Sequence, residues 1–242
     1  YRTTKGRPCQ CYHFHYTKSI QRKIIFSIKE FYHLYNRGVE KRNIFLEEKD
    51  RARFHKLIYL ANGTNPIRFR EVENQTFSSI DRGDPLIAIG AYVLMPNHFH
   101  ILVKEIVENG LSKYMEKLTT GYSMYFNKKY ERVGPLFQGR FKGEHVDNDE
   151  YLKYLYAYIH LNPMKIIEPN WKEIGIKDKK RALKYISQYY YSSYGDYYGI
   201  KREEGAILSK NEFPLYFSKN HNFKLYINDW LTFNKRVETL QK

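Results

Sequence analysis

The sequence predicts an α+β fold, in which helices cover one face of an antiparallel sheet and a helical extension follows. Short aromatic and aliphatic runs alternate with segments whose apolar residues recur every three or four positions. Two of the short runs are separated only by a tight turn, which is typical of antiparallel strands, and the others are separated by helices. Hairpins interleaved with helical crossovers are typical of α+β proteins.

The composition allows a domain-sized core and predicts a polyanionic partner. The 242 residues include 41 Lys and Arg against 26 Asp and Glu, giving a formal charge of +15, and 42% are hydrophobic. This excess favours nucleic acid, because each phosphate neutralised by Lys or Arg releases counterions. No stretch approaches the roughly 20 apolar residues that span a bilayer, so we expect a cytoplasmic protein with no membrane partner. The cysteines, Cys9 and Cys11, are too few for a disulfide framework.

Three parts are predicted along the chain. Residues 1–28 are a basic tail of unknown role, residues 29–169 form the folded domain, and residues 170–242 form a helical extension rich in Lys and Tyr. The tail is set apart because it lacks a hydrophobic period.

The domain begins with a strand and turn over residues 31–38, an aromatic run that ends at a glycine. A helix follows over residues 48–61, because its apolar residues share helical spacing. Residues 62–85 are polar and contain Gly and Pro, so we expect a long loop that forms a hairpin of its own. Residues 86–103 are predicted to be two strands joined by a turn at Pro96 and Asn97.

The second half of the domain repeats the alternation of helix and strand. Residues 111–126 have the clearest helical period, with Asn109 or Ser112 as the cap. After a break at residues 134–135, a strand is predicted over residues 136–146. Asp147 and Glu150 then match a capping box and open a helix that must end at Pro163.

His98 and His100 are the clearest candidates for metal ligands. Because side chains alternate along a strand, both imidazoles point to one face, about 6.6 Å apart in rise, and Phe99 points to the other. Such a pair can bind a divalent metal. The alternative is two histidines on a half-exposed strand. The same pattern occurs at His13 and His15 in the basic tail, so it is weak by itself.

The following helix offers a further ligand and a nucleophile. Tyr158 and Asn162 are four residues apart and share a face. An amide oxygen beside two imidazoles suits Mg²⁺ or Mn²⁺ and is also compatible with Zn²⁺. A phenol beside such a cation can act as a nucleophile towards a phosphate. The alternative is a packing stripe of Tyr151, Tyr154 and Tyr158, which spacing alone favours.

Basic residues near these candidates are predicted to contact DNA. Arg140 and Lys142 alternate with Phe141 on the predicted strand, which suits phosphate contacts beside a stacking ring. Further candidates are Arg37, Lys128 and Lys129. The alternative for the helical lysines is a solvated helix face, which we favour for Lys113 and Lys117. We expect His33, His145 and His160 to be structural.

Residues 29–169 resemble the single-tyrosine HUH transposases, and most closely the REP-associated tyrosine transposase branch. Four stretches in the expected order carry the likeness: FYHLYNRGVEKRNIF (31–45), YVLMPNHFHILV (92–103), GPLFQGRFK (134–142) and YIHLNP (158–163). The resemblance implies a ferredoxin-like fold, metal-binding His98 and His100, and a nucleophilic Tyr158. By the family pattern, Asn162 completes the metal site.

The implied activity is metal-dependent cleavage and rejoining of single-stranded DNA through a 5′-phosphotyrosine, with Mg²⁺ or Mn²⁺ as cofactor. The expected partner is single-stranded DNA with hairpin ends. Some relatives act as monomers and others as dimers that exchange the tyrosine helix, so a homodimer stays open. Two other functions also stay open: a domesticated hairpin-processing endonuclease, and a non-catalytic nucleic-acid-binding protein that keeps the basic surface.

Overall fold

A four-stranded antiparallel sheet in the order β2-β3-β1-β4 forms the centre of the protein, as seen in a computed structural model that describes residues 25–217 and 219–232. The strands are β1 (Phe31–Arg37), β2 (Ile87–Met95), β3 (His98–Glu105) and β4 (Lys142–Val146). Helix α1 (Glu48–Ala61) connects β1 to β2, and α3 (Gly110–Lys129) connects β3 to β4. This order is ferredoxin-like, which confirms the predicted α+β class.

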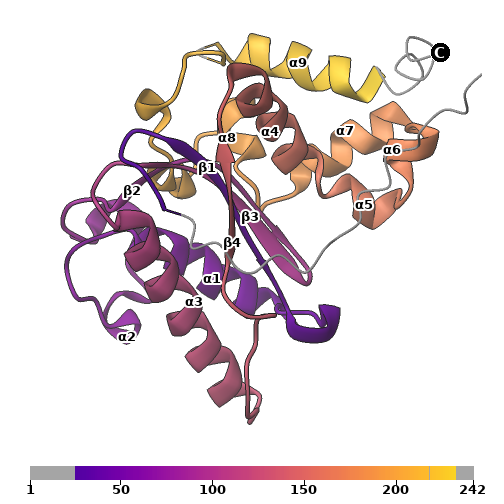
Figure 1. Ribbon diagram of the computed structural model, residues 1–242. Coiled ribbons are helices and arrows are strands. Elements are labelled where there is room, and N and C mark those ends of the chain that lie inside the picture. The colour runs from indigo at the N-terminus through magenta and orange to yellow at the C-terminus, as the bar shows by residue number, and fades with distance from the viewer. Residues whose placement is uncertain (1–24, 218, 233–242) are drawn as a thin grey trace, which may run out of the picture.

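Helices cover both faces of the sheet, whereas the sequence analysis expected one covered face. Helices α1 and α3 lie on one side, and α4 (Asp149–Leu161) and the extension lie on the other (Figure 1). The reason is visible in β2, whose nine residues are all buried. Ile89 packs with the α1 and α3 layer, and Val93 packs with α4. A strand that is apolar on both sides needs cover on both sides.

Helix α4 begins one position later than predicted. Asn148, and not Asp147, is the N-cap, because its Oδ1 accepts a hydrogen bond from the backbone N of Tyr151 at 2.7 Å. The helix ends at Leu161, with Asn162 as its C-cap immediately before Pro163. It therefore fixes Tyr158 and Asn162 in its last turn, as the spacing predicts.

Strand β4 is shorter than predicted. Gly134 and Gly139 have φ values of 91° and 110°, in a region that interrupts a strand and favours glycine. Phe137 makes an isolated bridge with Gly38, and the ladder with β1 starts at Lys142. Phe141 stacks on Phe26 with ring centroids 6.1 Å apart. The predicted alternation of Arg140, Phe141 and Lys142 on one strand is therefore wrong.

The remaining elements are short except for the two helices α7 and α9, whose bounds follow. Helix α2 (Phe69–Val72) and a 3₁₀ turn (Phe77–Ser79) occupy the loop where a hairpin was expected. After α4 come α5 (Met164–Ile167), α6 (Trp171–Ile174), α7 (Lys179–Gln188), α8 (Tyr194–Tyr198) and α9 (Asn220–Thr232). No described helix combines the length and apolar character that a bilayer span needs. Residues 1–24, which make up most of the predicted tail and include His13 and His15, lie outside the described residues.

The extension is joined to the outer edge of β2. The backbone N of Leu94 donates to the carbonyl of Tyr191 at 2.9 Å, and the backbone N of Ser193 donates to the carbonyl of Tyr92 at 3.0 Å. Arg202 lies at the same junction and donates to the Tyr92 hydroxyl at 3.1 Å. Most of the extension therefore packs with α4 in the second layer, and Tyr191 and Ile207 pack with the α1 and α3 layer.

Candidate active site

A row of polar side chains crosses the sheet on the face that α4 covers. In the antiparallel pairing of β1 with β3, Tyr35 lies opposite His100 and Arg37 lies opposite His98. Because side chains alternate along both strands, these four residues and His33 share one face. Phe99, between the two histidines, packs in the opposite layer with Phe54 of α1.

Tyr158 of α4 lies over this row. Its ring centroid is 5.3 Å from that of His100 and 5.8 Å from that of His33, with both ring pairs edge to face. The ring centroids of His98 and His100 are 5.0 Å apart. The predicted histidine pair and the predicted nucleophile therefore lie together, although β3 and α4 are separated in sequence by α3 and β4.

Asn162 completes the group from the end of α4. Its side chain is 1% exposed and lies close enough to His98 and Tyr158 to affect the pKa of both. Within the described ranges, neither of its amide atoms makes a well-aligned hydrogen bond. A buried amide group without a hydrogen bond destabilises the folded state by about 1–3 kcal/mol. A ligand bound to the amide oxygen would offset part of this destabilisation.

Two imidazoles and an amide oxygen fit a divalent cation such as Mn²⁺ or Mg²⁺. In the described part of the chain, no three His, Cys, Asp or Glu side chains form a cluster that could hold a metal. In a site built on His98 and His100, the Asn162 amide would be the third protein ligand.

The protonation state of His98 is compatible with a metal ligand. Burial lowers its pKa to about 4, and the positive charges of Arg37 and Lys165 act in the same direction. The imidazole is therefore neutral at pH 7, as a metal ligand must be. Its Nδ1 lies 2.6 Å from Oδ1 of Asn97, whose amide nitrogen donates to the carbonyl of Lys41. This contact places the proton on Nδ1 and leaves the Nε2 lone pair for a cation.

Two residues that the sequence analysis did not assign to the site lie beside it. His33, which was expected to be structural, has its Nε2 atom 2.9 Å from Nδ1 of His100. Glu144 lies opposite His33 on β4 and accepts hydrogen bonds from the hydroxyls of Tyr35 at 2.7 Å and Tyr151 at 3.1 Å.

Three of the predicted DNA contacts lie near this face. Arg37 is exposed and opposite His98, and Lys142 is exposed and opposite Tyr35 on β4. Arg140 is exposed in the bend before β4. These positions form a positive edge beside the row of histidines.

The other two predicted DNA contacts, Lys128 and Lys129, end α3 in the opposite layer. Lys128 is exposed. Lys129 lies 2.7 Å from the buried carboxylate of Asp50 and also pairs with Glu47. The charge of Lys129 is therefore neutralised within the fold.

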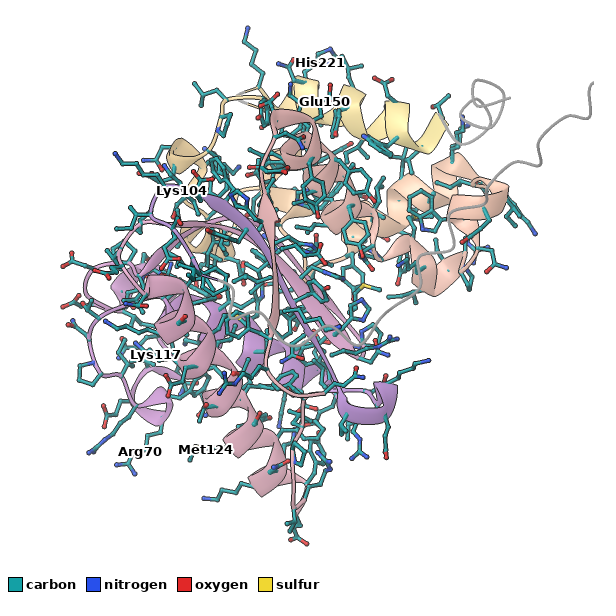
Figure 2. The ribbon with its side chains drawn as sticks, in the orientation of Figure 1. Arg70, Lys104, Lys117, Met124, Glu150 and His221 are labelled. Carbon is teal, nitrogen blue, oxygen red and sulfur yellow. The ribbon has the colours of Figure 1, made fainter. Side chains whose placement is uncertain are left out.

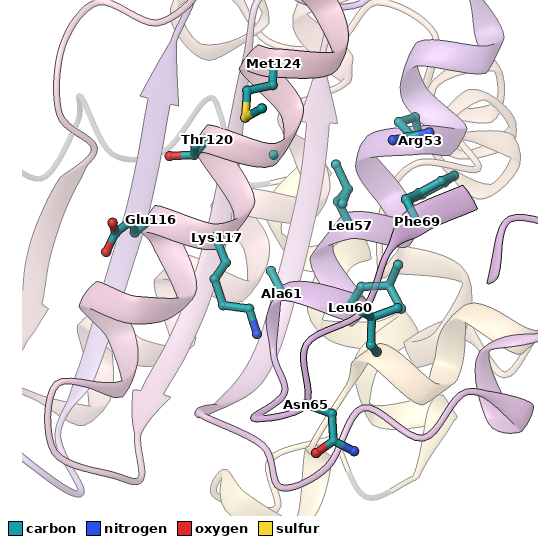
Figure 3. A pocket seen from close by; sticks show the side chains of 12 residues that line it. Arg53, Leu57, Leu60, Ala61, Asn65, Phe69, Glu116, Lys117, Thr120 and Met124 are labelled. Carbon is teal, nitrogen blue, oxygen red and sulfur yellow. The ribbon is translucent and has the colours of Figure 1, made fainter. Parts of the chain in front are cut away.

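A separate hollow of about 470 Å³ lies between α1, α2 and α3, away from these residues (Figure 3). Lys117 and Met124 of α3 line it. Figure 2 shows both residues on the helix layer opposite α4, whose start is marked by Glu150. None of the predicted metal, nucleophile or DNA residues lines this hollow.

Comparison with known protein families shows to which family the chain belongs. The family described as IS200-like transposases matches residues 27–162, which is more than half of the chain. The match includes His98, His100 and Tyr158 and ends at Asn162. The chain belongs to the IS200-like transposase family. No curated protein matches the sequence of this transposase.

Two solved structures resemble this IS200-like transposase weakly. A REP-associated tyrosine transposase bound to a REP hairpin is 12% identical, with a TM-score of 0.44 over 77% of this chain and 90% of that one. The tRNA(His) guanylyltransferase from Saccharomyces cerevisiae is 8% identical, with a TM-score of 0.36 over 84% of this chain and 89% of that one. The family assignment rests on the sequence match.

Glu144 should make the stability of the transposase depend on pH in the acid range. The nearby His33 imidazole, helped by the Tyr35 and Tyr151 hydroxyls, lowers the pKa of Glu144 from 4.5 to about 2. Its contribution to stability is therefore complete above the unfolded pKa and is lost as the pH falls from 4.5 towards 2. Glu144→Gln should flatten the pH dependence of the free energy of unfolding in this window, as measured by urea denaturation. An unchanged slope would contradict this prediction, and Glu150→Gln on α4 is the matched control.

Proposed function

We propose that this transposase cleaves and rejoins single-stranded DNA by transesterification, with Tyr158 as the nucleophile and Mg²⁺ or Mn²⁺ held by His98, His100 and Asn162. The observation that supports this most directly is the 5.3 Å between the ring centroids of Tyr158 and His100. A nucleophile and a cation can act on the same phosphate only when they are adjacent.

In the proposed reaction the Tyr158 hydroxyl oxygen attacks the phosphorus of a phosphodiester. A bond from this oxygen to phosphorus forms as the bond from phosphorus to O3′ breaks, and the phenolic proton ends on the released 3′-hydroxyl. The product is a 5′-phosphotyrosine, and attack by a 3′-hydroxyl reverses the step without ATP. A bound divalent cation would supply neutralisation of the phosphate charge.

The surroundings of Tyr158 suit a phosphate. Burial raises the pKa of its hydroxyl, and the Asn162 amide acts in the opposite direction. The phenol is therefore protonated before reaction, so it does not repel an approaching phosphate. Lys165 places its Nζ 5.8 Å from the centre of the Tyr158 ring and adds positive charge beside it.

We propose that Arg37 and Lys142 hold the DNA backbone beside Tyr158, and that Arg140 extends the same edge. Arg37 lies opposite His98, so a phosphate at the histidines would be within the field of its guanidinium. Lys128 is proposed to contact a more distant part of the DNA strand. Lys129 is not among the proposed DNA contacts, because Glu47 and Asp50 neutralise its charge.

Two features of the partners stay predictions: that the DNA substrate has hairpin ends, and that the protein forms a homodimer.

Mapping of a DNA adduct tests the proposed function. Hairpin-bearing single-stranded DNA labelled at its 3′ end is incubated with the protein and Mn²⁺ or Mg²⁺, and the labelled peptide is identified by mass spectrometry after proteolysis. We expect the label on Tyr158 and no adduct when the metal is chelated. Label on Tyr151 or Tyr154 would contradict the assignment. Absence of an adduct with every hairpin would favour the non-catalytic alternative.

A further inference from the structure

His33 and Glu144 lie behind the proposed metal site, and the proposed reaction does not use them. In the ladder between β1 and β3, His33 lies opposite Leu102, so His100 is its diagonal neighbour on the same face. The two imidazole rings are stacked, with centroids 5.0 Å apart and an interplanar angle of 25°. The 2.9 Å between His33 Nε2 and His100 Nδ1 is a hydrogen bond, so one of these atoms donates and the other accepts.

Glu144 sets the direction of this hydrogen bond. Its Oε2 atom lies 3.7 Å from Nδ1 of His33, which has no hydrogen bond to another described residue. An ionised carboxylate can only accept, so it favours a proton on Nδ1 of His33. A neutral His33 then has its lone pair on Nε2 and accepts from Nδ1 of His100. His100 is left with its lone pair on Nε2.

The carboxylate is itself held in place by two elements. The Tyr35 hydroxyl of β1 donates to Oε1, and the Tyr151 hydroxyl of α4 donates to Oε2. Tyr151 precedes Tyr158 by about two helical turns, so Glu144 also fastens the helix of the nucleophile to the sheet. His33 is 4% exposed, so water hardly competes for its ring nitrogens.

We infer that Glu144 and His33 form a carboxylate–imidazole–imidazole chain that fixes the His100 tautomer with an unprotonated Nε2, and that His33 is a positioning residue for the cation. The inference rests on the proposed metal site. Outer partners of metal-binding imidazoles typically contribute about 10–100-fold to metal affinity, because they fix the tautomer and the ring orientation.

Imidazole NMR without metal gives the first test. In ¹⁵N-labelled protein at neutral pH, His100 should be the tautomer with its proton on Nδ1. In His33→Leu, which removes the acceptor, the tautomer with its proton on Nε2 should become populated. A proton on Nε2 of His100 in the unchanged protein would overturn the inference, whatever the protein does to DNA.

Binding of Mn²⁺, followed by electron paramagnetic resonance of the free ion, gives the second test. His33→Leu should weaken binding by about 10–100-fold. His33→Gln should restore most of it, because a glutamine oxygen can take the place of Nε2 and accept from His100. Thermal unfolding of each metal-free variant checks that the fold is intact, and Glu144→Leu replaces His33→Leu if that variant does not fold.

His98→Ala separates the two possible failures. If His98→Ala binds Mn²⁺ as tightly as the unchanged protein, the proposed metal site is wrong. If His98→Ala loses binding and His33→Leu does not, the metal site stands and the role of His33 is wrong.

Discussion

Replacing Tyr158 with phenylalanine should abolish covalent attachment of DNA and leave DNA binding almost unchanged. Phenylalanine keeps the ring that packs edge to face against His100 and His33, and it removes only the attacking oxygen. Loss of a nucleophile lowers the rate by at least about 1000-fold. The adduct is measured on a denaturing gel and binding by fluorescence anisotropy with the same hairpin DNA.

Tyr154→Phe is the matched control for this prediction. Tyr154 lies one turn earlier on the same helix face, with its ring centroid 5.8 Å from that of Tyr158. Tyr154→Phe should still form the DNA adduct, because the Tyr154 hydroxyl has no role in the proposed reaction. An adduct that persists in Tyr158→Phe and disappears in Tyr154→Phe would move the nucleophile to Tyr154.

Replacing Asp196 with alanine should destabilise the fold by about 3–5 kcal/mol, the usual effect of leaving a buried charge without its partner. The side chains of Arg202 and Asp196 are 11% and 3% exposed, and their closest charged atoms are 2.5 Å apart. Arg202 also donates to the carbonyl of Ser192 at 2.5 Å. Removal of the Asp196 carboxylate should therefore weaken the junction between the extension and β2. The destabilisation is measured as the decrease in the free energy of unfolding in urea.

An exposed ion pair provides the control for Asp196. Glu212 pairs with Lys104 at 2.9 Å, with side chains that are 42% and 19% exposed. Glu212→Ala should cost about 0–1 kcal/mol, because water solvates the charge that remains. An equally small loss for Asp196→Ala would show that water reaches Arg202 at the junction.

The sequence predicts the parts of the site that depend on local periodicity. His98 and His100 share a face because strand side chains alternate, and Tyr158 and Asn162 share a face because helical residues four apart do. The fold class follows from the same two periods. The unbroken apolar run of β2 was also a signal that both faces of the sheet are covered, although the prediction placed helices on one face.

The parts that the sequence does not predict depend on pairing between distant segments. His33 lies beside His100, and Glu144 beside His33, only because β1 pairs with both β3 and β4 in a particular register. The pairing of Lys129, a predicted DNA contact, with acidic side chains is hidden from the sequence for the same kind of reason. Its partner Asp50 is buried near the start of α1, and no local pattern around Lys129 indicates this.

The attachment of residues 191–193 to β2 also limits how copies of this chain can associate. An uncovered edge strand presents backbone groups that a strand from another molecule can extend, and this is a common route to aggregation. At β2 the extension already occupies the backbone groups of Tyr92 and Leu94. A second molecule that lengthened this sheet would therefore add at β4, the other end of the strand order, next to Lys142 and the positive edge.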